Sequence, residues 1–368
     1  MVLRTMKISE ITDTEKDIFN NFIAWFPWGD LLQSWEWGEL KSKSGWTPIR
    51  LLARDDTGEV CAAASILKKP LPFLKNRCIF YIPRGFVMDT IDRDRVTEFT
   101  GYIRGLARKH GAILVKIDPP IEISDSVSLD NLRSAGFREV VQEGFGGTQP
   151  KCVMQLMLTD RDGRQKSLDD IFGAFKEKWR YNIRLSARRG VTARTDCTKE
   201  DLPVFYELLK ETCERDGFLV RGYEYFSNMW DLLEPQGYLK LFLTYYEGTP
   251  VTGSLCYLWG DKAMYTYGAS SNSHRKHMPN HLMQWEMIKW AHANNCRIYD
   301  FRGVSPQKDG EDKLSGLNRF KEGFSPEFIE YIGEYDLVID PFLYGIWVKL
   351  LPRIRGTMKA MAGSKRNA

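Results

Sequence analysis

The chain has 368 residues, of which 43% are hydrophobic and 13% aromatic, and its formal net charge is only +4. This length accommodates two ordinary domains, and so weak a net charge says little about partners. No apolar run approaches the roughly 20 residues that span a bilayer, and the charged N-terminal segment lacks the apolar core of a secretory signal, so we expect a soluble cytoplasmic protein. The seven cysteines are scattered without a CxxC pair, which predicts free thiols and no disulfide framework.

One order of elements occurs twice along the chain: strand, tight turn, strand, strand, helix, strand. In the first copy the segments are 50–67 with a turn at Gly58, 77–89, 94–111 and 112–120. In the second copy they are 241–259 with a turn at Gly248, 262–271, 281–295 and 296–304. Both helical segments place apolar residues at i, i+3 and i+4, and the strands are short apolar runs. The repeat predicts two domains of one α/β (α+β) type.

A Gly- and Pro-containing stretch, 143–151, separates the copies and is typical of a linker. We therefore expect one domain at 1–149 and a second at 150–330. The remaining segment, 331–368, is expected to pack back on the first domain and to end in a basic tail. Beyond Asp340 the chain has no acidic residue, and six cations accompany Trp347 and two leucines. This composition is compatible with an amphipathic surface helix near anionic lipid or RNA, whereas Pro352 favours a partly disordered tail.

Basic residues are concentrated between positions 176 and 194. If one helix starts near Leu168, four apolar side chains share one of its faces and four cations share the other. These cations are Lys176, Arg180, Arg184 and Arg188. A solvated basic face and a phosphate-binding surface are the alternatives.

Two further helices are predicted between residues 202 and 238, joined around 219–222, which places Arg221 and Tyr225 at a helix start. Three histidines, at positions 274, 277 and 281, lie close together in sequence. Pro279 falls between them and neither a carboxylate nor a thiol is near, so a surface loop is a better interpretation than a zinc site. No P-loop, GxSxG elbow or dinucleotide motif is present.

Nine segments, in order, resemble landmarks of the Fem peptidoglycan-bridge aminoacyltransferases. They are 32–41, 81–89, 178–191, 218–226, 264–271, 281–291, 299–305, 319–324 and 330–341. The resemblance implies two tandem GNAT-like acyltransferase domains with mixed sheets and flanking helices, and no cofactor or metal. It also implies transfer of an amino acid from aminoacyl-tRNA to the side-chain amine of the third stem-peptide residue of a wall precursor. The acceptor would be UDP-MurNAc-pentapeptide or lipid II, with peripheral contact to the inner membrane surface.

The resemblance further implies a set of site residues. Those lining the precursor site are Lys41, Arg221, Tyr225 and Tyr267, and those at the reacting groups are Phe320 and Lys321. Each has a simpler alternative: a solvated helix end for Lys41, half-buried core phenols for the tyrosines, and a core ring for Phe320.

The chemistry of ester aminolysis suits this set. An aminoacyl ester is already activated, so the enzyme must position the amine and stabilise the oxyanion that forms, a role that fits Lys321. The acceptor amine must also lose a proton. Asp118 is a candidate acceptor, with an Asp-Pro turn residue as the alternative, and the tRNA's own terminal hydroxyl or phosphate is another. The tRNA acceptor stem is expected to meet Lys176, Arg180, Arg184 and Arg188 through its phosphates.

Two features depart from the family pattern: Phe86 stands where a proline is usual, and the long helical-hairpin arm of the staphylococcal members is absent. Rival functions also remain. A CoA-dependent N-acyltransferase shares the fold type, although no pyrophosphate loop is seen. A tRNA-dependent transferase acting on a small metabolite and a non-catalytic precursor-binding protein are the others.

Overall fold

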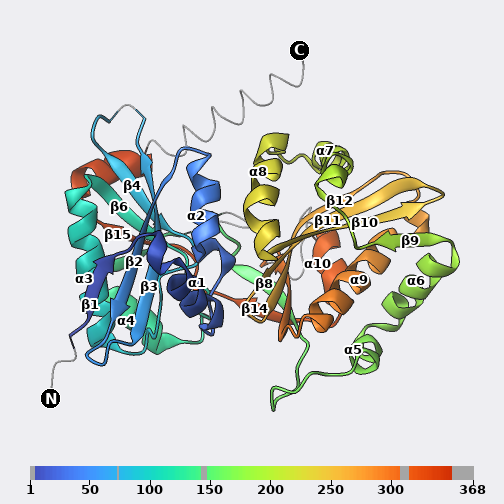
Figure 1. Cartoon of the computed structure of the whole chain (residues 1–368), viewed down its shortest axis with the longest axis horizontal. Coiled ribbons are helices and arrows are strands. Elements are labelled where there is room, and N and C mark those ends of the chain that lie inside the picture. The colour runs from blue at the N-terminus through green and yellow to red at the C-terminus, as the bar shows by residue number, and fades with distance from the viewer. Residues whose placement is uncertain (1–4, 73, 142–146, 307–314, 350–368) are drawn as a thin grey trace. The chain divides into compact units, whose positions relative to one another are not determined.

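The structure is a computed structural model that describes residues 5–72, 74–141, 147–306 and 315–349. It divides into two compact units: a first unit of residues up to 141 together with those from 332 onward, and a second unit of residues 142–331. Each unit contains a mixed sheet with flanking helices (Figure 1). The fold class predicted from the sequence is thus confirmed. Of the predicted linker, residues 143–146 lie outside the described residues.

The first unit is built on a sheet of the order β1-β2-β3-β4-β6-β15-β7, with β5 paired to β3. Its elements in chain order are β1 (Lys7–Glu10), α1 (Lys16–Trp25), α2 (Trp35–Ser42), β2 (Thr47–Arg54), β3 (Val60–Pro70), β4 (Cys78–Ile82), β5 (Val87–Met88), α3 (Arg93–Lys109), β6 (Ala112–Ile117), α4 (Ser126–Ser134), β7 (Phe137–Glu139) and β15 (Tyr335–Val338). Helices α1 and α2 pack on one face over β2 and β3, and α3 and α4 cover the other face (Figure 1). Strand β15 lies between β6 and β7 and is antiparallel to both, so a segment near the C-terminus completes the first sheet.

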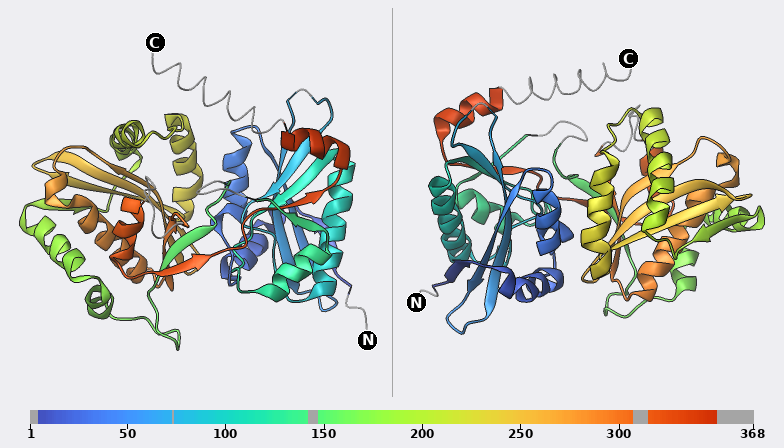
Figure 2. Two further views of the ribbon diagram at one scale, coloured as in Figure 1. Left: turned by 180° about the vertical axis from the view of Figure 1, so that it is seen from behind. Right: turned by 45° about the horizontal axis from the view of Figure 1, so that its top comes forward.

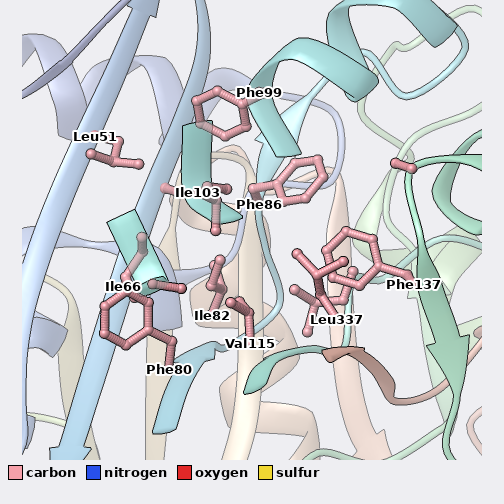
Figure 3. Packing of buried hydrophobic residues seen from close by; sticks show 14 of the residues in the cluster. Leu51, Ile66, Phe80, Ile82, Phe86, Phe99, Ile103, Val115, Phe137 and Leu337 are labelled. Carbon is pink, nitrogen blue, oxygen red and sulfur yellow. The ribbon is translucent and has the colours of Figure 1, made fainter. Parts of the chain in front are cut away.

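The core between α3 and this sheet is dense in aromatic rings, as Figure 3 shows. Phe86 is buried there, with ring centroids 5.4 Å from Phe99 and 6.1 Å from Phe137. Phe86 therefore fills the core, which explains why a large apolar residue is accepted where the family pattern has proline.

The second unit has a sheet of the order β14-β8-β13-β12-β11-β10-β9. Its elements are β8 (Cys152–Met157), α5 (Leu168–Ala174), α6 (Glu177–Arg188), β9 (Val191–Arg194), α7 (Leu202–Asp216), α8 (Tyr223–Leu233), β10 (Leu239–Tyr246), β11 (Thr249–Trp259), β12 (Lys262–Ser270), α9 (Pro279–Ala293), β13 (Ile298–Gly303), α10 (Ser315–Glu322) and β14 (Glu327–Glu330). Helix α9 packs on one face of the sheet and α7 on the other, with α8 beside α7 (Figure 2).

The predicted repeat in the order of elements is confirmed, and the structure shows that the strand pairing repeats as well. In the first copy β2, β3 and β4 are antiparallel neighbours, and α3 then crosses to β6, which pairs parallel with β4. In the second copy β10, β11 and β12 are antiparallel neighbours, and α9 crosses to β13, which pairs parallel with β12. The turns that join the first two strands of each copy contain Gly58 and Gly248, both at positive φ, a conformation that glycine adopts without strain.

The prediction of one basic helix from Leu168 is wrong, because the segment forms two helices, α5 and α6. Phe175 is extended and buried, with ring centroids 5.2 Å from Phe324 and 5.7 Å from Trp285. Burying this ring turns the chain, and the backbone N–H of Lys176 donates to the carbonyl of Gly323 at 2.9 Å instead of continuing the helix. Tertiary packing therefore overrides local helical periodicity here.

The histidine prediction needs a partial correction. His274 and His277 lie in the segment before α9, but His281 is on α9 itself, where its ring is 5.1 Å from Phe320 and 5.5 Å from Trp179. Across the described ranges, no group of three His, Cys, Asp or Glu residues is arranged to hold a metal ion. Nor does any helix in those ranges have the length and apolar character needed to cross a membrane. The predicted basic tail beyond residue 349 lies outside the described residues.

Candidate active site

The candidate site of the second unit begins where two strands stop pairing. Strands β12 and β13 are paired in parallel only from Lys262–Ile298 to Met264–Asp300. Beyond this point β12 continues along β11, and the chain of β13 turns at Arg302, a non-glycine residue at φ 60°. The backbone carbonyls at this turn are therefore available to a side chain.

That side chain is Lys321, which α10 carries into the turn. Its Nζ donates to the carbonyl oxygen of Gly303 at 2.7 Å and lies 3.5 Å from the carbonyl oxygen of Arg302. Lys321 is only 3% exposed. Burial lowers the pKa of its ammonium to about 7, although the charge of Asp300 opposes that shift. A lysine that is partly neutral near pH 7 is unusual and often functional.

Asp300 fixes the backbone of this turn. Its carboxylate accepts the backbone N–H of Arg302 at 2.6 Å and the side-chain amide of Gln155 at 3.1 Å. Gln155 also donates to the hydroxyl of Tyr331 at 3.0 Å. The buried carboxylate is thus held by neighbouring strands and holds the turn that binds Lys321.

Helix α10 is attached to the same turn by an amide clip. The side chain of Asn318 accepts the backbone N–H of Ser305 and donates to its carbonyl oxygen, each at 3.1 Å. Both residues are buried, so these hydrogen bonds fix where α10, and with it Lys321, lies.

Phe320 is half-buried beside Lys321. Its carbonyl oxygen accepts the indole N–H of Trp179 at 2.9 Å, and its ring is 5.4 Å from Phe324. The chain can pass this close only because residue 323 is glycine: a Cβ there would lie 1.9 Å from the Trp179 ring. Phe320 is therefore part of an aromatic layer under α10.

Arg221, Tyr225 and Tyr267 come together in the second unit. The Arg221 guanidinium lies 4.7 Å from the centroid of the Tyr225 ring, and Tyr225 hydrogen-bonds to Tyr267. Burial, then the neighbouring Tyr267, raises the pKa of Tyr225 well above its usual range. Tyr225 is therefore a neutral phenol at physiological pH, and Arg221 supplies positive charge beside the two tyrosines.

Two residues of this cluster were missed by reasoning from the sequence. Tyr257 of β11 is fully buried, and its pKa is raised by burial and by Tyr267 and Tyr225, while Arg302 and Arg221 act in the opposite direction. Arg302 also lowers the pKa of Lys321. The charge of Arg302 therefore acts both on the tyrosine cluster and on the buried Lys321. Arg302 lies in a segment that resembles the family, whereas Tyr257 has only the pattern of a core strand.

The other two predicted residues, Lys41 and Asp118, belong to the first unit. Lys41 is in the last turn of α2, half-buried, with its Nζ 5.9 Å from the Trp37 ring centroid. Asp118 follows β6 and is fully buried. Its two carboxylate oxygens accept the Tyr81 hydroxyl and the backbone N–H of Arg84, both at 2.6 Å. Burial raises the pKa of the Asp118 carboxyl to about 6. Asp118 thus holds the loop of Arg84 in place.

The four cations of the basic segment differ in their surroundings. Arg180 donates to the carbonyl oxygens of Gly173 and Phe175, at 2.5 and 2.8 Å, and so caps the break between α5 and α6. Lys176 is 3.9 Å from Glu322, and the guanidinium of Arg184 is 5.0 Å from the Phe172 ring. Arg188 lies exposed, 5.9 Å from the ring of Tyr181. Arg180 has a structural role, and Arg184 and Arg188 offer the more accessible charge.

Comparison with known proteins first shows which fold the chain shares. The chain has the fold of a tandem GNAT protein from the clavulanic acid biosynthesis pathway, with a TM-score of 0.53 at 11% identity over 91% of this chain and 99% of that one. It is much more similar to the crystal structure of FemX, with a TM-score of 0.83 and 29% identity over 92% of this chain and 99% of that one. A lipid II:glycine glycyltransferase of Staphylococcus haemolyticus (strain JCSC1435) is 30% identical over 95% of this chain and 97% of its own length.

The chain belongs to the FemAB family, which matches residues 14–247 and 240–350. Like its named relatives it is an aminoacyltransferase. The alignment with the S. haemolyticus enzyme extends over 414 positions, more than the 368 residues of this chain, so that relative has insertions that this chain lacks. The longest described helix, α3, has 17 residues, in keeping with a compact member of the family.

Proposed function

We propose that this enzyme transfers an amino acid from aminoacyl-tRNA to the side-chain amine of the third stem-peptide residue of a peptidoglycan precursor, as a step of interpeptide-bridge formation. The observation that carries the proposal is the buried Lys321, with a pKa of about 7, at a turn linked through Arg302 to the Arg221–tyrosine cluster. The names of the sequence relatives support lipid II as the acceptor class.

Lys321 is proposed to act on the oxyanion of the tetrahedral intermediate. When the neutral acceptor amine attacks the ester carbonyl, a C–N bond forms and negative charge develops on the carbonyl oxygen. The ester C–O bond then breaks, and the 3′-terminal ribose oxygen of the tRNA leaves as a hydroxyl with the proton that the amine gives up. A positioned ammonium in a low-dielectric site stabilises that charge far more than water would. The carbonyls of Gly303 and Arg302 orient Nζ without neutralising it, since neither is a carboxylate.

The precursor is proposed to bind at the Arg221 cluster through its pyrophosphate. The guanidinium of Arg221 and the hydroxyls of Tyr225 and Tyr267 supply donors of the kind that phosphate and sugar oxygens accept. Lys41 of the first unit is proposed as a further phosphate ligand. For Asp118, whose oxygens are both occupied within its own unit, positioning the Arg84 loop is better supported than accepting the amine's proton.

The donor tRNA is proposed to contact the exposed cations Arg184 and Arg188 of α6 through its phosphates. A cytoplasmic location with contact to the inner membrane surface follows from such substrates.

The decisive experiment measures transfer of radiolabel from a mixed aminoacyl-tRNA pool to UDP-linked and lipid-linked precursors. We expect RNase-sensitive labelling that is lost in Lys321→Ala and kept in Arg319→Ala, an exposed cation on the same helix. Label that resists RNase, or transfer that needs an acyl-CoA, would overturn the proposal in favour of ordinary N-acyltransferase chemistry. Labelling of a small metabolite but of neither precursor would assign a different acceptor.

A further inference from the structure

The first unit has a basic cavity that takes no part in the proposed transfer. It has a volume of about 940 Å³ and lies where β3 ends, β4 begins and α3 ends. Its basic lining residues are Lys68, Lys75, Arg77, Arg108, Lys109 and His110. No aspartate or glutamate of the described chain lines it. A hollow with this lining favours an anionic partner.

Internal contacts neutralise little of this charge. Arg77 is 3.6 Å from Asp340, and Lys68 is 3.5 Å from Nδ1 of His110. Burial and the nearby Lys68 lower the pKa of His110. The positive charge of the cavity therefore comes mainly from its lysines and arginines. The remaining cations, Lys75, Arg108 and Lys109, are exposed, and no carboxylate in the described ranges forms an ion pair with them. Because Arg108 and Lys109 are in the last turn of α3, the helix dipole stabilises them without a counter-ion.

An amphipathic helix at 341–349 borders this cavity. Leu343, Tyr344 and Trp347 pack inward on a small cluster that contains Leu71 and Leu74, two residues that also line the cavity. Phe342 and Ile346 share a side of the helix that faces away from this cluster, and they are 76% and 38% exposed, whereas Val348, 47% exposed, lies on the other flank. In both views of Figure 2 this helix, coloured red, lies beside the loop that joins β3 to β4. The exposed cations Lys75, Arg108 and Lys109 and the exposed apolar side chains of the bordering helix are here called the basic-apolar surface.

We propose that the basic-apolar surface docks the enzyme on an anionic phospholipid bilayer. Lys75, Arg108 and Lys109 would meet lipid phosphates, while Phe342 and Ile346 enter the boundary between headgroups and acyl chains. The exposed aliphatic side chain of Ile346 favours lipid over RNA, since a sugar-phosphate backbone gains nothing from it. The chain beyond Asp340 has six Lys and Arg residues and no Asp or Glu, so it carries the charge sign that such a membrane attracts.

This inference deepens the proposed contact with the membrane, and it can fail independently of the transfer reaction, because vesicle binding requires neither donor nor acceptor. The test is co-sedimentation of the full chain with vesicles of phosphatidylcholine alone or with 30 mol% phosphatidylglycerol. We expect binding only to the anionic vesicles at low ionic strength, and release at high salt, where the Debye length falls to about 3 Å.

Two double variants locate the surface. Arg108→Glu with Lys109→Glu should weaken vesicle binding at least about 30-fold, since each basic residue near an anionic surface contributes a factor of roughly five. Its matched control, Lys7→Glu with Arg93→Glu, changes two exposed cations of the same unit, and Arg93 is about 22 Å away along α3. Phe342→Ser with Ile346→Ser should also weaken binding, whereas Ile123→Ser with Val127→Ser, another exposed apolar pair, should not.

Transfer to the soluble UDP-linked precursor should be unchanged in all four double variants, which shows that each is folded. Equal binding to neutral and anionic vesicles, or equal losses in a test variant and its control, would overturn the proposal. So would loss of tRNA binding with vesicle binding intact in Arg108→Glu with Lys109→Glu, because the surface would then be an RNA site.

Discussion

The Nζ of Lys321 lies 2.7 Å from the carbonyl oxygen of Gly303, and among the residues that the structure describes no carboxylate is in direct contact with it. Asp300 acts on this ammonium only through space, since its oxygens are held by Arg302 and Gln155. The lysine is therefore oriented by backbone dipoles and remains close to its titration point. Several consequences can be measured.

Replacing Lys321 should abolish most of the transfer. We expect Lys321→Ala to lower kcat by about 10²- to 10³-fold, the usual effect of removing one oxyanion donor. If the ammonium is the active form, kcat of the wild type should fall as pH rises above about 7, where the lysine loses its proton. In Lys321→Arg, whose side chain stays charged, kcat should not show this decrease above pH 7. Because deprotonation of the acceptor amine raises the rate of both proteins with pH, a rise through pH 7 that is present in the wild type and absent from Lys321→Arg would assign Lys321 the role of a base. Because the ester of aminoacyl-tRNA also hydrolyses in water, the transfer rate at each pH is corrected for this loss of donor.

The same lysine should make stability depend on pH. Its folded pKa is about 7 and its unfolded value is 10.5, so between these values the unfolded chain binds more protons. The stability contribution is full above pH 10.5 and is lost as pH falls towards 7. Compared with Lys321→Met, the wild type should therefore gain free energy of unfolding by up to about 1.4 kcal/mol per pH unit in this window. Urea unfolding at pH 7 and pH 9 measures it, and a constant difference would contradict the low pKa.

Loss of Arg221 should weaken precursor binding more than turnover. Hydrogen bonds to charged groups are worth about 1.5–3 kcal/mol, so Arg221→Ala should raise the KM for the UDP-linked precursor roughly 10- to 100-fold. The KM for aminoacyl-tRNA should not change, which provides an internal control. A matched variant, Arg215→Ala, removes an arginine that is bound to the carbonyl of Ser270 in the same unit. Should both variants raise the KM for the precursor equally, the assignment of Arg221 to phosphate binding would be wrong.

Asn318 should act through the position of α10. In Asn318→Asp the donor that faces the carbonyl of Ser305 is replaced by an oxygen, and a buried unsatisfied group costs about 1–3 kcal/mol. We expect a lower Tm and a lower kcat with nearly unchanged KM, because Lys321 moves with its helix. Arg319→Ala, on the exposed side of α10, should leave both unchanged. A variant with lower Tm but full kcat would show that the clip is only structural.

Replacing Arg180 should affect stability, whereas replacing Arg188 should affect tRNA binding. Arg180→Ala removes two hydrogen bonds to backbone carbonyls at the α5–α6 break and should reduce stability by about 1–3 kcal/mol. Arg188→Ala should leave stability intact, weaken tRNA binding and reduce the salt dependence of that binding by about one phosphate contact. Chemical denaturation and salt titrations of tRNA affinity test the pair. Identical salt slopes for wild type and Arg188→Ala would exclude a phosphate contact there.

Asp118 should influence stability at acid pH. Its folded pKa is about 6 and the ordinary pKa of an aspartate is 3.8, so the folded state binds more protons between these values. The stability contribution is full below pH 3.8 and is lost as pH rises through about 6. Relative to Asp118→Asn, the wild type should therefore become less stable over this range. Urea unfolding of both proteins across this range measures the effect, and a stability difference that stays constant with pH would contradict the raised pKa.

The sequence by itself determined the repeat and the positions of most elements. Strand and helix periodicities are local properties, so two copies of one order were visible without a structure, whereas the parallel pairing of β12 with β13 was seen only in the fold. Lys321 and Phe320 could be proposed because they lie in a short segment that resembles the family. The sequence also indicated that Arg221 and Tyr225 lie at one helix start.

Only the tertiary structure decided how distant segments meet. Phe175 breaks a helix because its ring is buried against residues more than a hundred positions away, which no local pattern reveals. From the sequence, Tyr257 is indistinguishable from an ordinary core residue of a strand. In the folded protein, the charges of Arg302 and Arg221 act on its hydroxyl. The low pKa of Lys321 likewise depends on desolvation, and desolvation is a property of the packed site rather than of any residue in it.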